Sequence, residues 1–451
     1  MRQKQQFAKL GLFDAKVPRY TSYPTAPHFN TGIGAPFFED CLSKIPEGAE
    51  ISLYVHVPFC RRLCWFCACR TQGTQSASPV AAYVDVLRTE LRMLTDRLPE
   101  GVTLSRLHWG GGTPTLLTPE MIDQITDAIF ETAPMAAGGE FSVEIDPNEL
   151  DEARLDALAR AGMTRASIGV QDFDPDIQDI IGRQQSYALT KDVSEMIRAR
   201  GIDSLNADIL FGLPDQNLEK ITESVQKLLS LSPDRVALYG YAHVPWMAKR
   251  QQLIPSDKLP TPEERLALFE AASKLFEWDG YDAIGIDHFA LPSDGLAKAA
   301  KAGTLRRNFQ GYTDDQADVL IGIGASSISR FPQGFAQNAP ATAAYIKAIE
   351  SGRFSVSRGH RFSGEDTLNS RLIEAVMCDF AVDTAEIVDL FDITPTQLRQ
   401  RFEAVNTEFD GLLSVTHDGL YIPPEVRPLT RLIARSFDAY DQTKARHSAA
   451  I

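Results

Sequence analysis

The sequence has no long apolar run. Across its 451 residues, no window approaches the roughly 20 consecutive apolar residues that a membrane-spanning helix needs. The first residues, Met-Arg-Gln-Lys-Gln-Gln-Phe, also lack the apolar core of a secretory signal. We therefore expect a cytoplasmic protein that does not enter a membrane.

Basic residues are also in short supply. Lys and Arg together number 45, against 60 Asp and Glu, which gives a formal net charge of −15. A protein this acidic repels polyanions, so nucleic acid is not an expected partner. An anionic substrate must therefore meet a local cluster of basic side chains.

Cysteine is scarce except in one short loop. The chain has 6 cysteines, of which four fall between positions 60 and 69. Such crowding is unlike a disulfide framework and suits a reducing compartment. The spacing is Cys60-x3-Cys64-x2-Cys67, directly after a strand-like run at residues 51–57.

Thiolates at this spacing indicate zinc or an iron-sulfur cluster. A closed structural zinc site needs four ligands, usually as two separated pairs, whereas this loop offers three close together. A cluster held by three thiolates keeps one iron open for a small molecule, so we interpret Cys60, Cys64 and Cys67 as ligands of a four-iron four-sulfur cluster. A half zinc site or a set of buried cysteines is the alternative.

A fourth thiol, Cys69, lies two residues after Cys67. Holding two corners of one cubane with both residues would strain so short a connection. We therefore interpret Cys69 as a reactive or orienting thiol with a catalytic role rather than as a ligand.

Strand-like and amphipathic runs alternate from residue 51 to about residue 290, which is the order of βα units on a parallel sheet. The intervening segments have helical spacing, as in the apolar stripe from Val80 to Leu94. We expect an α/β fold with a partial or complete parallel (β/α) barrel spanning residues 51–365, whose site lies at the carboxyl ends of the strands. The strand-like runs are 51–57, 104–109, 140–145, 165–170, 204–211, 235–241 and 281–286.

Two flanking segments differ from this barrel. Residues 1–50 form a polar arm whose prolines make residues 18–26 extended, and we expect it to cover the active site while adding little to a core. Residues 366–451 are helix-rich, with a hairpin signal at His417-Asp-Gly419 and a last helix expected at 428–440. They predict a smaller, mostly helical, winged-helix-like domain.

Glycines and polar residues follow several of the predicted strands. Gly110 to Gly112 follow the second strand and remove side chains that would keep a ligand away from the backbone, although an ordinary tight turn is the alternative. Glu144 ends the third strand and suits an ammonium or ribose hydroxyls, and Gln171 ends the fourth. Asp208 lies inside an apolar strand and needs a partner or ligand.

The cysteine loop resembles that of the radical S-adenosylmethionine superfamily, together with the preceding Tyr54-Val-His-Val-Pro-Phe and the later Gly-Gly-Thr-Pro. Further stretches resemble one branch over nearly the whole chain, the oxygen-independent coproporphyrinogen III oxidase (dehydrogenase) family. They are Pro18 to Ala26, Cys67-Ala-Cys69, Gly169-Val-Gln-Asp-Phe173, Phe211-Gly-Leu-Pro214, Tyr241-Ala-His243, Asn308-Phe-Gln-Gly-Tyr312 and Phe437-Asp-Ala-Tyr440.

The resemblance implies a mechanism. The open iron of the cluster binds S-adenosylmethionine, and one electron from the reduced cluster releases a 5'-deoxyadenosyl radical. That radical takes a β-hydrogen from a propionate of coproporphyrinogen III, and loss of carbon dioxide and an electron leaves a vinyl group. Two propionates react in turn and give protoporphyrinogen IX for haem and porphyrin biosynthesis.

The resemblance also implies which residues bind the cofactors and the substrate. One S-adenosylmethionine would lie against Tyr54, Gly111, Glu144 and Ile328. A second would contact Phe66, Gly112, Thr113, Gln171, Arg183, Asp208 and Ala242. Candidates for the substrate carboxylates are Arg19, Arg306 and Arg307, whose guanidinium forks suit such groups. The electron would come from a flavodoxin or ferredoxin system, and we expect a monomer.

Three alternatives stay open. A haem-binding chaperone of the same superfamily resembles the chain in its first three cysteines, but lacks the Cys-x-Cys and the long arm that are present here. A radical haem-modifying methyltransferase is separated less cleanly by sequence. The third is a zinc-stabilised protein with a winged-helix tail that binds DNA.

Overall fold

Parallel strands form the centre of a twelve-stranded mixed sheet in the computed structural model, which describes residues 2–440 and 450. At one edge lies β16 (Val356–Arg361) and at the other β9 (Asp282–Ile284), and in the described chain these edges do not join. The barrel is therefore partial. Its parallel strands follow the spatial order β13 (Leu320–Ile323), β1 (Glu50–Val57), β4 (Thr103–Gly111), β5 (Met135–Ile145), β6 (Arg165–Gln171), β7 (Ser204–Phe211) and β8 (Arg235–Gly240).

The first six predicted strands are confirmed as β1 and β4 to β8, and the seventh is present only as a short strand that does not pair with β8. The short strand β9 within residues 281–286 pairs antiparallel with β10 (His288–Ala290), which in turn pairs antiparallel with β8. The parallel strand β13 was missed because it has only four residues, one of them Gly322, and so shows no periodicity.

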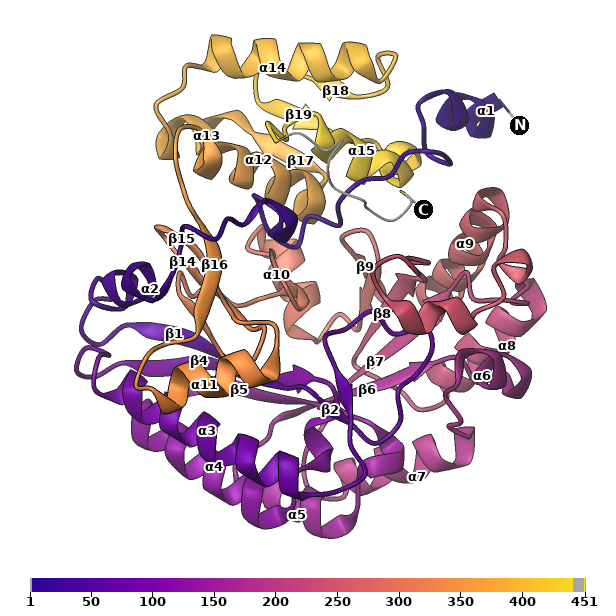
Figure 1. Cartoon of the computed structure of the whole chain (residues 1–451). Coiled ribbons are helices and arrows are strands. Elements are labelled where there is room, and N and C mark those ends of the chain that lie inside the picture. The colour runs from indigo at the N-terminus through magenta and orange to yellow at the C-terminus, as the bar shows by residue number, and fades with distance from the viewer. Residues whose placement is uncertain (1, 441–449, 451) are drawn as a thin grey trace.

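Helices cover the outer face of the sheet between successive parallel strands (Figure 1). The predicted apolar stripe from Val80 to Leu94 lies in the first of them and is buried, as expected. These helices are α3 (Ser78–Thr95), α4 (Pro119–Thr132), α5 (Glu152–Arg160), α6 (Pro175–Ile181), α7 (Tyr187–Arg198), α8 (Leu218–Leu229) and α9 (Pro262–Trp278).

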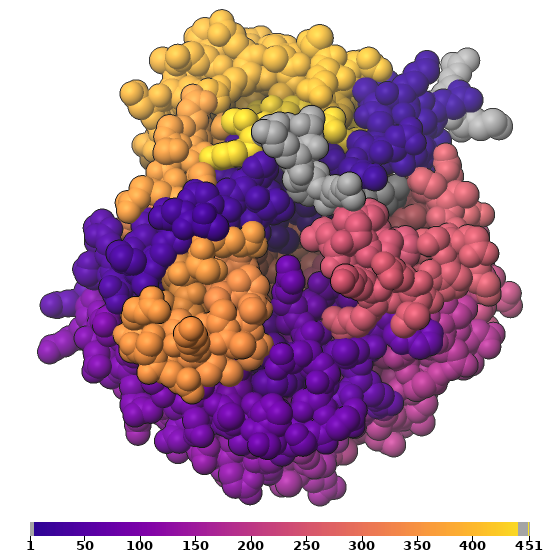
Figure 2. Space-filling view, in the orientation of Figure 1, coloured from indigo at the N-terminus to yellow at the C-terminus, as the bar shows by residue number. Residues whose placement is uncertain are grey.

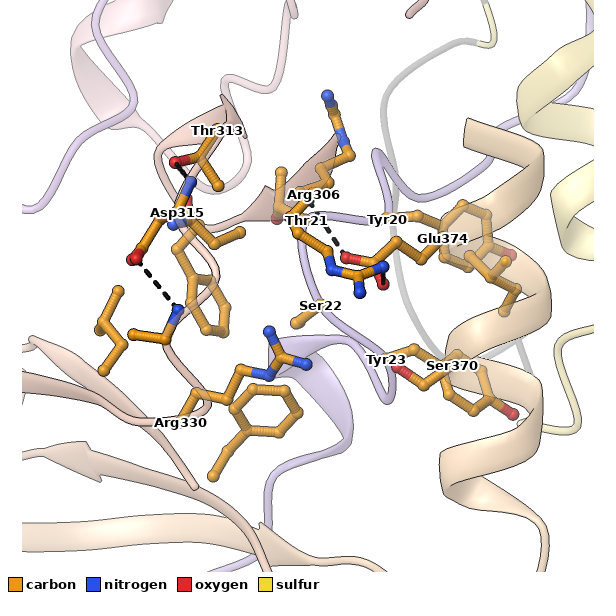
Figure 3. A pocket seen from close by; sticks show the side chains of 17 residues that line it. Tyr20, Thr21, Ser22, Tyr23, Arg306, Thr313, Asp315, Arg330, Ser370 and Glu374 are labelled. Carbon is orange, nitrogen blue, oxygen red and sulfur yellow. Dashed lines mark hydrogen bonds and ion pairs between the residues drawn. The ribbon is translucent and has the colours of Figure 1, made fainter. Parts of the chain in front are cut away.

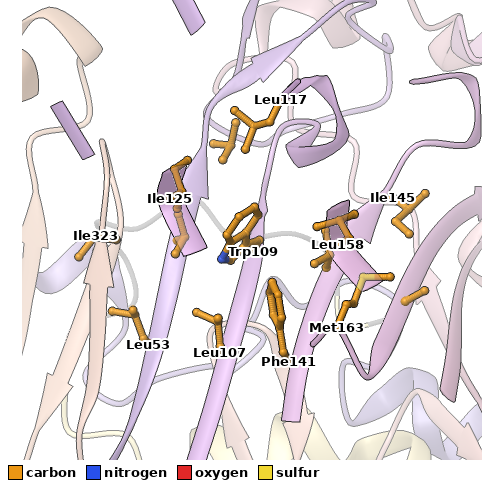
Figure 4. Packing of buried hydrophobic residues seen from close by; sticks show 14 of the residues in the cluster. Leu53, Leu107, Trp109, Leu117, Ile125, Phe141, Ile145, Leu158, Met163 and Ile323 are labelled. Carbon is orange, nitrogen blue, oxygen red and sulfur yellow. The ribbon is translucent and has the colours of Figure 1, made fainter. Parts of the chain in front are cut away.

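The main core fills the space between these helices and the sheet. Trp109 of β4 packs against Phe141 of β5 with ring centroids 5.4 Å apart. Ile125 of α4 and Leu158 of α5 close the layer from the helical side (Figure 4). This packing holds the strand ends rigidly, and it is on those ends that the candidate site lies.

Antiparallel strands extend the sheet beyond β13, where β14 (Ile328–Phe331), β15 (Gly334–Asn338) and β16 follow in order. Helix α11 (Thr342–Glu350) connects β15 to β16. Between β10 and β13 the chain forms α10 (Gly295–Ala302) and a hairpin of β11 (Arg306–Asn308) with β12 (Gly311–Thr313).

The C-terminal segment forms a small unit above the open side of the sheet (Figure 1). The predicted hairpin is confirmed, because β18 and β19 pair antiparallel and β17 adds a third strand. The expected last helix is shorter than predicted, since the turn that contains Pro428 precedes it. The elements are α12 (Asp366–Asp379), β17 (Ala381–Asp383), α13 (Thr384–Leu390), α14 (Pro395–Glu408), β18 (Ser414–Val415), β19 (Gly419–Tyr421), η6 (Pro424–Leu429) and α15 (Thr430–Arg435).

The N-terminal arm lies between this unit and the barrel (Figure 2). It contains α1 (Arg2–Lys9), η1 (Ala26–His28) and α2 (Ala35–Leu42). Residues 18–25 are outside any helix, as predicted, but residues 21–24 bend instead of continuing an extended run. The expectation that the arm adds little to a core was wrong. Apolar side chains of residues 7–23 are buried in one cluster with the C-terminal helices, namely Phe7, Leu12, Phe13, Val17, Tyr20 and Tyr23.

In the part of the chain that the structure describes, every helix is too short or too polar to span a bilayer.

Candidate active site

The cysteine loop leaves the carboxyl end of β1 and returns to it. Cys60 belongs to β2 (Phe59–Cys60), and β3 (Gln72–Gly73) pairs parallel with that strand. The loop between them carries Cys64, Cys67 and Cys69, and all six cysteines of the chain are free thiols. The predicted ligands therefore lie at the carboxyl edge of the parallel sheet, as the barrel interpretation requires.

Other parts of the barrel fix the loop in place. The backbone N–H of Trp65 donates to the carbonyl of Ile181 at 2.9 Å. A Cβ on Gly182 would lie 3.0 Å from the Trp65 ring, so the absence of a side chain there makes room for the indole. These contacts attach the loop to α6, which follows β6, and β4 and β5 separate β6 from β1 in the sheet.

Two residues that the sequence did not reveal also hold the loop. Gln251, in the turn η4 (Lys249–Leu253), donates to the carbonyls of Phe66 at 2.6 Å and Ala242 at 3.0 Å. Arg250 donates to the carbonyl of Cys69 at 3.2 Å. The turn carries no motif and lies about 180 residues further along the chain, so only the fold brings these groups together.

The thiols differ in their electrostatic surroundings. Burial raises the pKa of Cys60 to about 11. A hydrogen bond with Cys69 lowers the pKa of Cys67, and the same interaction raises the pKa of Cys69. Arg183 Nη1 donates to Cys64 Sγ at 3.7 Å. The interaction therefore favours the thiolate at Cys67 over the thiolate at Cys69.

The donor set fits an iron-sulfur cluster in its chemistry. Cys60, Cys64 and Cys67 are unpaired, soft ligands on one short loop. In the described chain, no three potential ligands are already grouped tightly enough to hold a metal ion.

The glycines after β4 have a tighter environment than the sequence suggested. A Cβ on Gly112 would lie 2.5 Å from the Phe59 carbonyl oxygen, and one on Gly111 would lie 2.5 Å from the His56 ring. The N–H groups of Gly112 and Thr113 donate to the carbonyls of Val57 and Phe59. These glycines therefore allow backbone to pack against backbone and a ring, and their approach to a ligand stays a prediction.

Glu144 ends β5 beside this loop. Its Oε2 accepts from the N–H of Gly111 at 3.0 Å, and its Oε1 lies 3.5 Å from His108 Nε2. Burial acts to raise the pKa of Glu144, but these hydrogen bonds outweigh it and hold the pKa below its ordinary value. Glu144 is therefore an anion suited to bind an ammonium group.

Gln171 and Arg183 meet at Gly169 near the end of β6. Gln171 has a φ of +70°, a left-handed conformation that costs energy for a residue with a side chain and often marks a functional position. Arg183 Nη2 donates to the Gly169 carbonyl at 2.7 Å, and its Nη1 lies 3.6 Å from Asp146 Oδ2. The guanidinium thus links β6 to Cys64.

Asp208 projects into the sheet interior from β7. It accepts from Asn206 Nδ2 at 2.9 Å, and burial raises its pKa to about 6. Asp208 and Glu144 line the same cavity of about 130 Å³. Two carboxyl groups from different strands therefore face one small polar space.

The remaining cofactor candidates lie at the same edge. Tyr54 stacks on His108 with centroids 5.8 Å apart, and its hydroxyl lies 3.0 Å from His56 Nδ1. Tyr54 pairs in register with Gly322, which packs against the backbone of Ile328. The predicted cofactor residues, spread from position 54 to 328, thus converge on one region.

A large cavity of about 640 Å³ adjoins this region. Its lining includes Ala242 and His243 at the end of β8, as well as Arg19 of the N-terminal arm. The basic residues of its wall are Lys16, Arg19, Arg265, Arg427 and Arg431, against the acids Glu277 and Asp287. On a chain of net charge −15, this wall is a local positive surface.

Arg306 and Arg307 line a different pocket, together with residues 20–23 of the arm (Figure 3). Arg306 Nη1 lies 3.7 Å from Glu374 Oε2. Arg307 is buried, and its guanidinium lies 4.3 Å from the centroid of the Tyr312 ring. Of the three predicted carboxylate-binding arginines, the structure thus brings only Arg19 to the large cavity.

Comparison with known proteins gives the class. Residues 54–228 match the family model described as "Radical SAM superfamily". This range holds the cysteine loop, the glycine loop, Glu144, Gln171, Arg183 and Asp208. The partial barrel and the three-thiol loop at its carboxyl edge are the features that define this class here.

Full-length relatives give the family. An oxygen-independent coproporphyrinogen III oxidase of Paracoccus denitrificans (strain Pd 1222) is 64% identical over 451 residues, which is 100% of both chains. One of Cereibacter sphaeroides (strain ATCC 17023) is 58% identical over 96% of both chains. A solved structure of coproporphyrinogen III oxidase from Escherichia coli, described as a radical SAM enzyme, superposes with a TM-score of 0.89 at 32% identity, over 95% of this chain and 100% of that one. The chain belongs to the oxygen-independent coproporphyrinogen III oxidase family.

Proposed function

We propose that the protein converts two propionate side chains of coproporphyrinogen III to vinyl groups and so forms protoporphyrinogen IX without oxygen. The observation that carries this proposal is the position of the large basic cavity. It contains Ala242, whose carbonyl Gln251 ties to Phe66 of the cysteine loop. A polyanionic substrate in the cavity would therefore lie beside the cofactor loop.

The cavity suits a tetrapyrrole in size and charge. About 640 Å³ lies within the range of roughly 300–1,000 Å³ typical of small-molecule sites. Five basic residues against two acids favour a ligand with several carboxylates, and Phe211, Trp246 and Phe269 supply apolar surface for its rings.

Cys60, Cys64 and Cys67 would hold a four-iron four-sulfur cluster. When bound, the cluster and S-adenosylmethionine supply the radical that removes a β-hydrogen atom from a propionate, which then loses carbon dioxide and one electron. This chain's residues position the reacting carbon and exclude water. The backbone N–H of Cys69 donates to Cys67 Sγ at 3.4 Å, and we assign Cys69 an orienting role beside that ligand.

Two molecules of S-adenosylmethionine are part of the proposal. Glu144 would accept hydrogen bonds from the ammonium group of the first S-adenosylmethionine, near Tyr54, Gly111 and Ile328. The second would use Arg183 for its carboxylate and Asp208 for hydroxyl or ammonium groups, near Phe66, Gly112, Thr113, Gln171 and Ala242. Equilibrium binding to cluster-loaded protein should give a stoichiometry of two, and a stoichiometry of one would remove the second site.

The electron donor and the state of the protein are further parts of the proposal. We expect a flavodoxin or ferredoxin system to reduce the cluster, because the radical chemistry needs one low-potential electron at a time. The six free thiols suit a reducing cytoplasm. We expect a monomer, which light scattering of the cluster-loaded protein would test.

Anaerobic product analysis tests the function. Cluster-loaded protein with S-adenosylmethionine, a reductant and coproporphyrinogen III should release carbon dioxide and give a product with two vinyl groups. Methionine and 5'-deoxyadenosine should accumulate with it. Full iron loading and S-adenosylmethionine cleavage without any vinyl product would overturn the proposal, and a methylated or merely bound haem would favour the sequence-based alternatives.

A further inference from the structure

The pocket that Arg306 and Arg307 share with residues 20–23 of the arm, called the arm pocket below, contains a third arginine. This is Arg330 of β14, whose guanidinium points into the space between the strand and the arm (Figure 3). The cavity there measures about 50 Å³. A space of this size holds only a few water molecules, so it suits a carboxylate head group but not a ring system.

The alternation of residues along β14 directs Arg330 toward the side of the sheet on which the candidate active site lies. Ser329 and Phe331 are buried, and Phe331 belongs to the main core between the sheet and the helices. Successive side chains of a strand point to opposite faces. Arg330 therefore shares a face with Ile328, a predicted S-adenosylmethionine residue, and points away from that core.

The other two arginines of the arm pocket already have acidic partners. Arg306 Nη1 lies 3.7 Å from Glu374 Oε2, and Arg307 Nη1 lies 4.0 Å from Asp287 Oδ1. Arg330 differs from both, because none of the residues that the structure describes offers its guanidinium a hydrogen bond or an ion pair. The fork of Arg330 is therefore available to a ligand.

The two acids of the pocket wall are engaged elsewhere. Glu374 accepts from the backbone N–H of Arg307 at 3.2 Å, in addition to its pairing with Arg306. Asp315 Oδ1 accepts from Ser105 Oγ at 3.2 Å. Neither carboxylate neutralises the charge at β14.

A half-buried cation without a partner favours a bound anion. Removing water from around a charge costs free energy unless an opposite charge takes the place of that water. A carboxylate does so well, since its two oxygens accept two parallel hydrogen bonds from a guanidinium fork. Carboxylate is also the anionic group that a propionate-bearing substrate brings.

The arm pocket shares walls with the spaces of the candidate active site. Asn308 and Thr313 line both the arm pocket and the polar cavity that Glu144 and Asp208 face. His288 lines both that polar cavity and the large cavity. A ligand that spans these neighbouring spaces can place a carboxylate in the arm pocket while its rings lie beside the cofactor residues.

We propose that Arg330 binds one propionate carboxylate of the tetrapyrrole in the arm pocket and thereby selects for a substrate with several carboxylates. This inference rests on the proposed function and deepens it. Arg330 lies two residues after Ile328 on one face of β14. A carboxylate held there therefore fixes the ring system relative to the first S-adenosylmethionine.

Binding of a non-reacting substrate analogue tests the site. Coproporphyrin III keeps all four carboxylates, and its tetraamide has the same ring and side-chain length without the charges. In the full-length, cluster-loaded protein, Arg330→Gln should weaken coproporphyrin III binding about ten- to a hundredfold and leave tetraamide binding unchanged. Iron content and S-adenosylmethionine affinity should match the wild type. Arg399→Gln, which removes an exposed charge from α14, is the matched control.

The comparison of acid and amide distinguishes recognition from structure. Unchanged affinity of Arg330→Gln for the acid, or equal losses for acid and amide, would overturn the carboxylate site. A loss of S-adenosylmethionine affinity with full affinity for the acid would give the carboxylate to the cofactor and overturn the substrate site as well.

A second variant keeps the test decisive. Arg330→Lys retains the charge without the fork, should lose only a few-fold in affinity for the acid, and carries the test if the Gln variant does not fold. A wild-type protein that binds the acid but makes no vinyl product would overturn the proposed function instead, and the variants would still decide the site.

Discussion

Glu144 Oε2 accepts a hydrogen bond from the backbone N–H of Gly111 at 3.0 Å, which fixes the acid at the end of β5 against the glycine loop at the end of β4. The same carboxylate lies 3.5 Å from His108, itself stacked on Tyr54. One acid therefore organises the ends of three neighbouring strands, β1, β4 and β5.

Glu144→Gln should weaken S-adenosylmethionine binding. The amide keeps the shape of the side chain but removes the negative charge that an ammonium requires. A charge-assisted hydrogen bond contributes about 1.5–3 kcal/mol, so we expect at least a tenfold loss of affinity by calorimetry with unchanged iron content. Glu120→Gln, at the exposed start of α4, should have no effect, and a full-affinity Glu144→Gln would contradict the assignment.

Serine variants separate the roles of the four loop thiols. Cys60→Ser, Cys64→Ser and Cys67→Ser should each abolish the brown absorbance of the cluster and all S-adenosylmethionine cleavage, because each removes one of three anchors. Cys69→Ser should keep its iron and lose turnover, because its two-residue spacing from Cys67 excludes Cys69 as a cluster ligand. Iron loss in Cys69→Ser as complete as in the other three would make Cys69 a ligand.

The sequence predicted the part of the site that a short local motif of cysteines defines. The spacing of Cys60, Cys64 and Cys67 depends on local chain length alone, so a linear pattern reveals it. The positions of Gln251 and Arg265 depend on how η4 and α9 pack onto distant strand ends. No periodicity encodes such contacts, and both residues were missed.

The fold was predictable to a similar extent. Strands β4 to β8 are regular apolar runs between helices, whereas β13 has four residues and no pattern to read. The N-terminal arm was judged polar because its apolar residues are interleaved with polar ones. In the structure, Phe13, Val17 and Tyr20 point into one cluster with the C-terminal helices, a face that an irregular backbone creates and that no helical or strand period describes.

Gly112→Val should lower both the thermal stability and the iron loading of the protein. A Cβ at this position would lie 2.5 Å from the Phe59 carbonyl oxygen, and backbone cannot give way as a flexible side chain can. We expect a lower thermal midpoint and reduced iron loading, because Phe59 directly precedes Cys60. Gly138→Val meets no heavy atom within 4 Å of its Cβ and is a control for added bulk, although its φ of +78° adds some strain of its own. An unchanged midpoint in Gly112→Val would contradict the packing argument.

Deletion of residues 1–26 should loosen the C-terminal unit in addition to removing Arg19 from the substrate cavity. The deletion exposes apolar surface of the shared cluster, and burial of one large apolar side chain contributes about 1.5–3 kcal/mol. Limited proteolysis should cut the 366–440 region faster than in the wild type, while the cluster stays bound. Tyr20→Phe, which loses only the 3.0 Å bond to Asp438, should show a much smaller change. If limited proteolysis cuts the deletion variant and the wild type equally fast, the arm serves substrate binding alone and does not stabilise the C-terminal unit.

Asp287→Asn should reduce stability in a pH-dependent way. Asp287 Oδ1 accepts from His288 Nδ1 at 2.7 Å and lies 4.0 Å from Arg307 Nη1. Burial acts to raise the pKa of Asp287, but His288, Arg307 and Arg19 outweigh it and lower the pKa from 3.8 to about 2. Because the folded pKa is depressed, the ionised carboxylate contributes its stability above pH 3.8 and loses it as the pH falls toward 2.

The thermal midpoint of Asp287→Asn should therefore lie below that of the wild type at pH 7, and the gap should narrow below pH 4. Asp318→Asn, at an exposed position, should show little difference at any pH, and a gap for Asp287→Asn that stays constant from pH 7 to pH 3 would show that the charge of Asp287 is not what stabilises the fold.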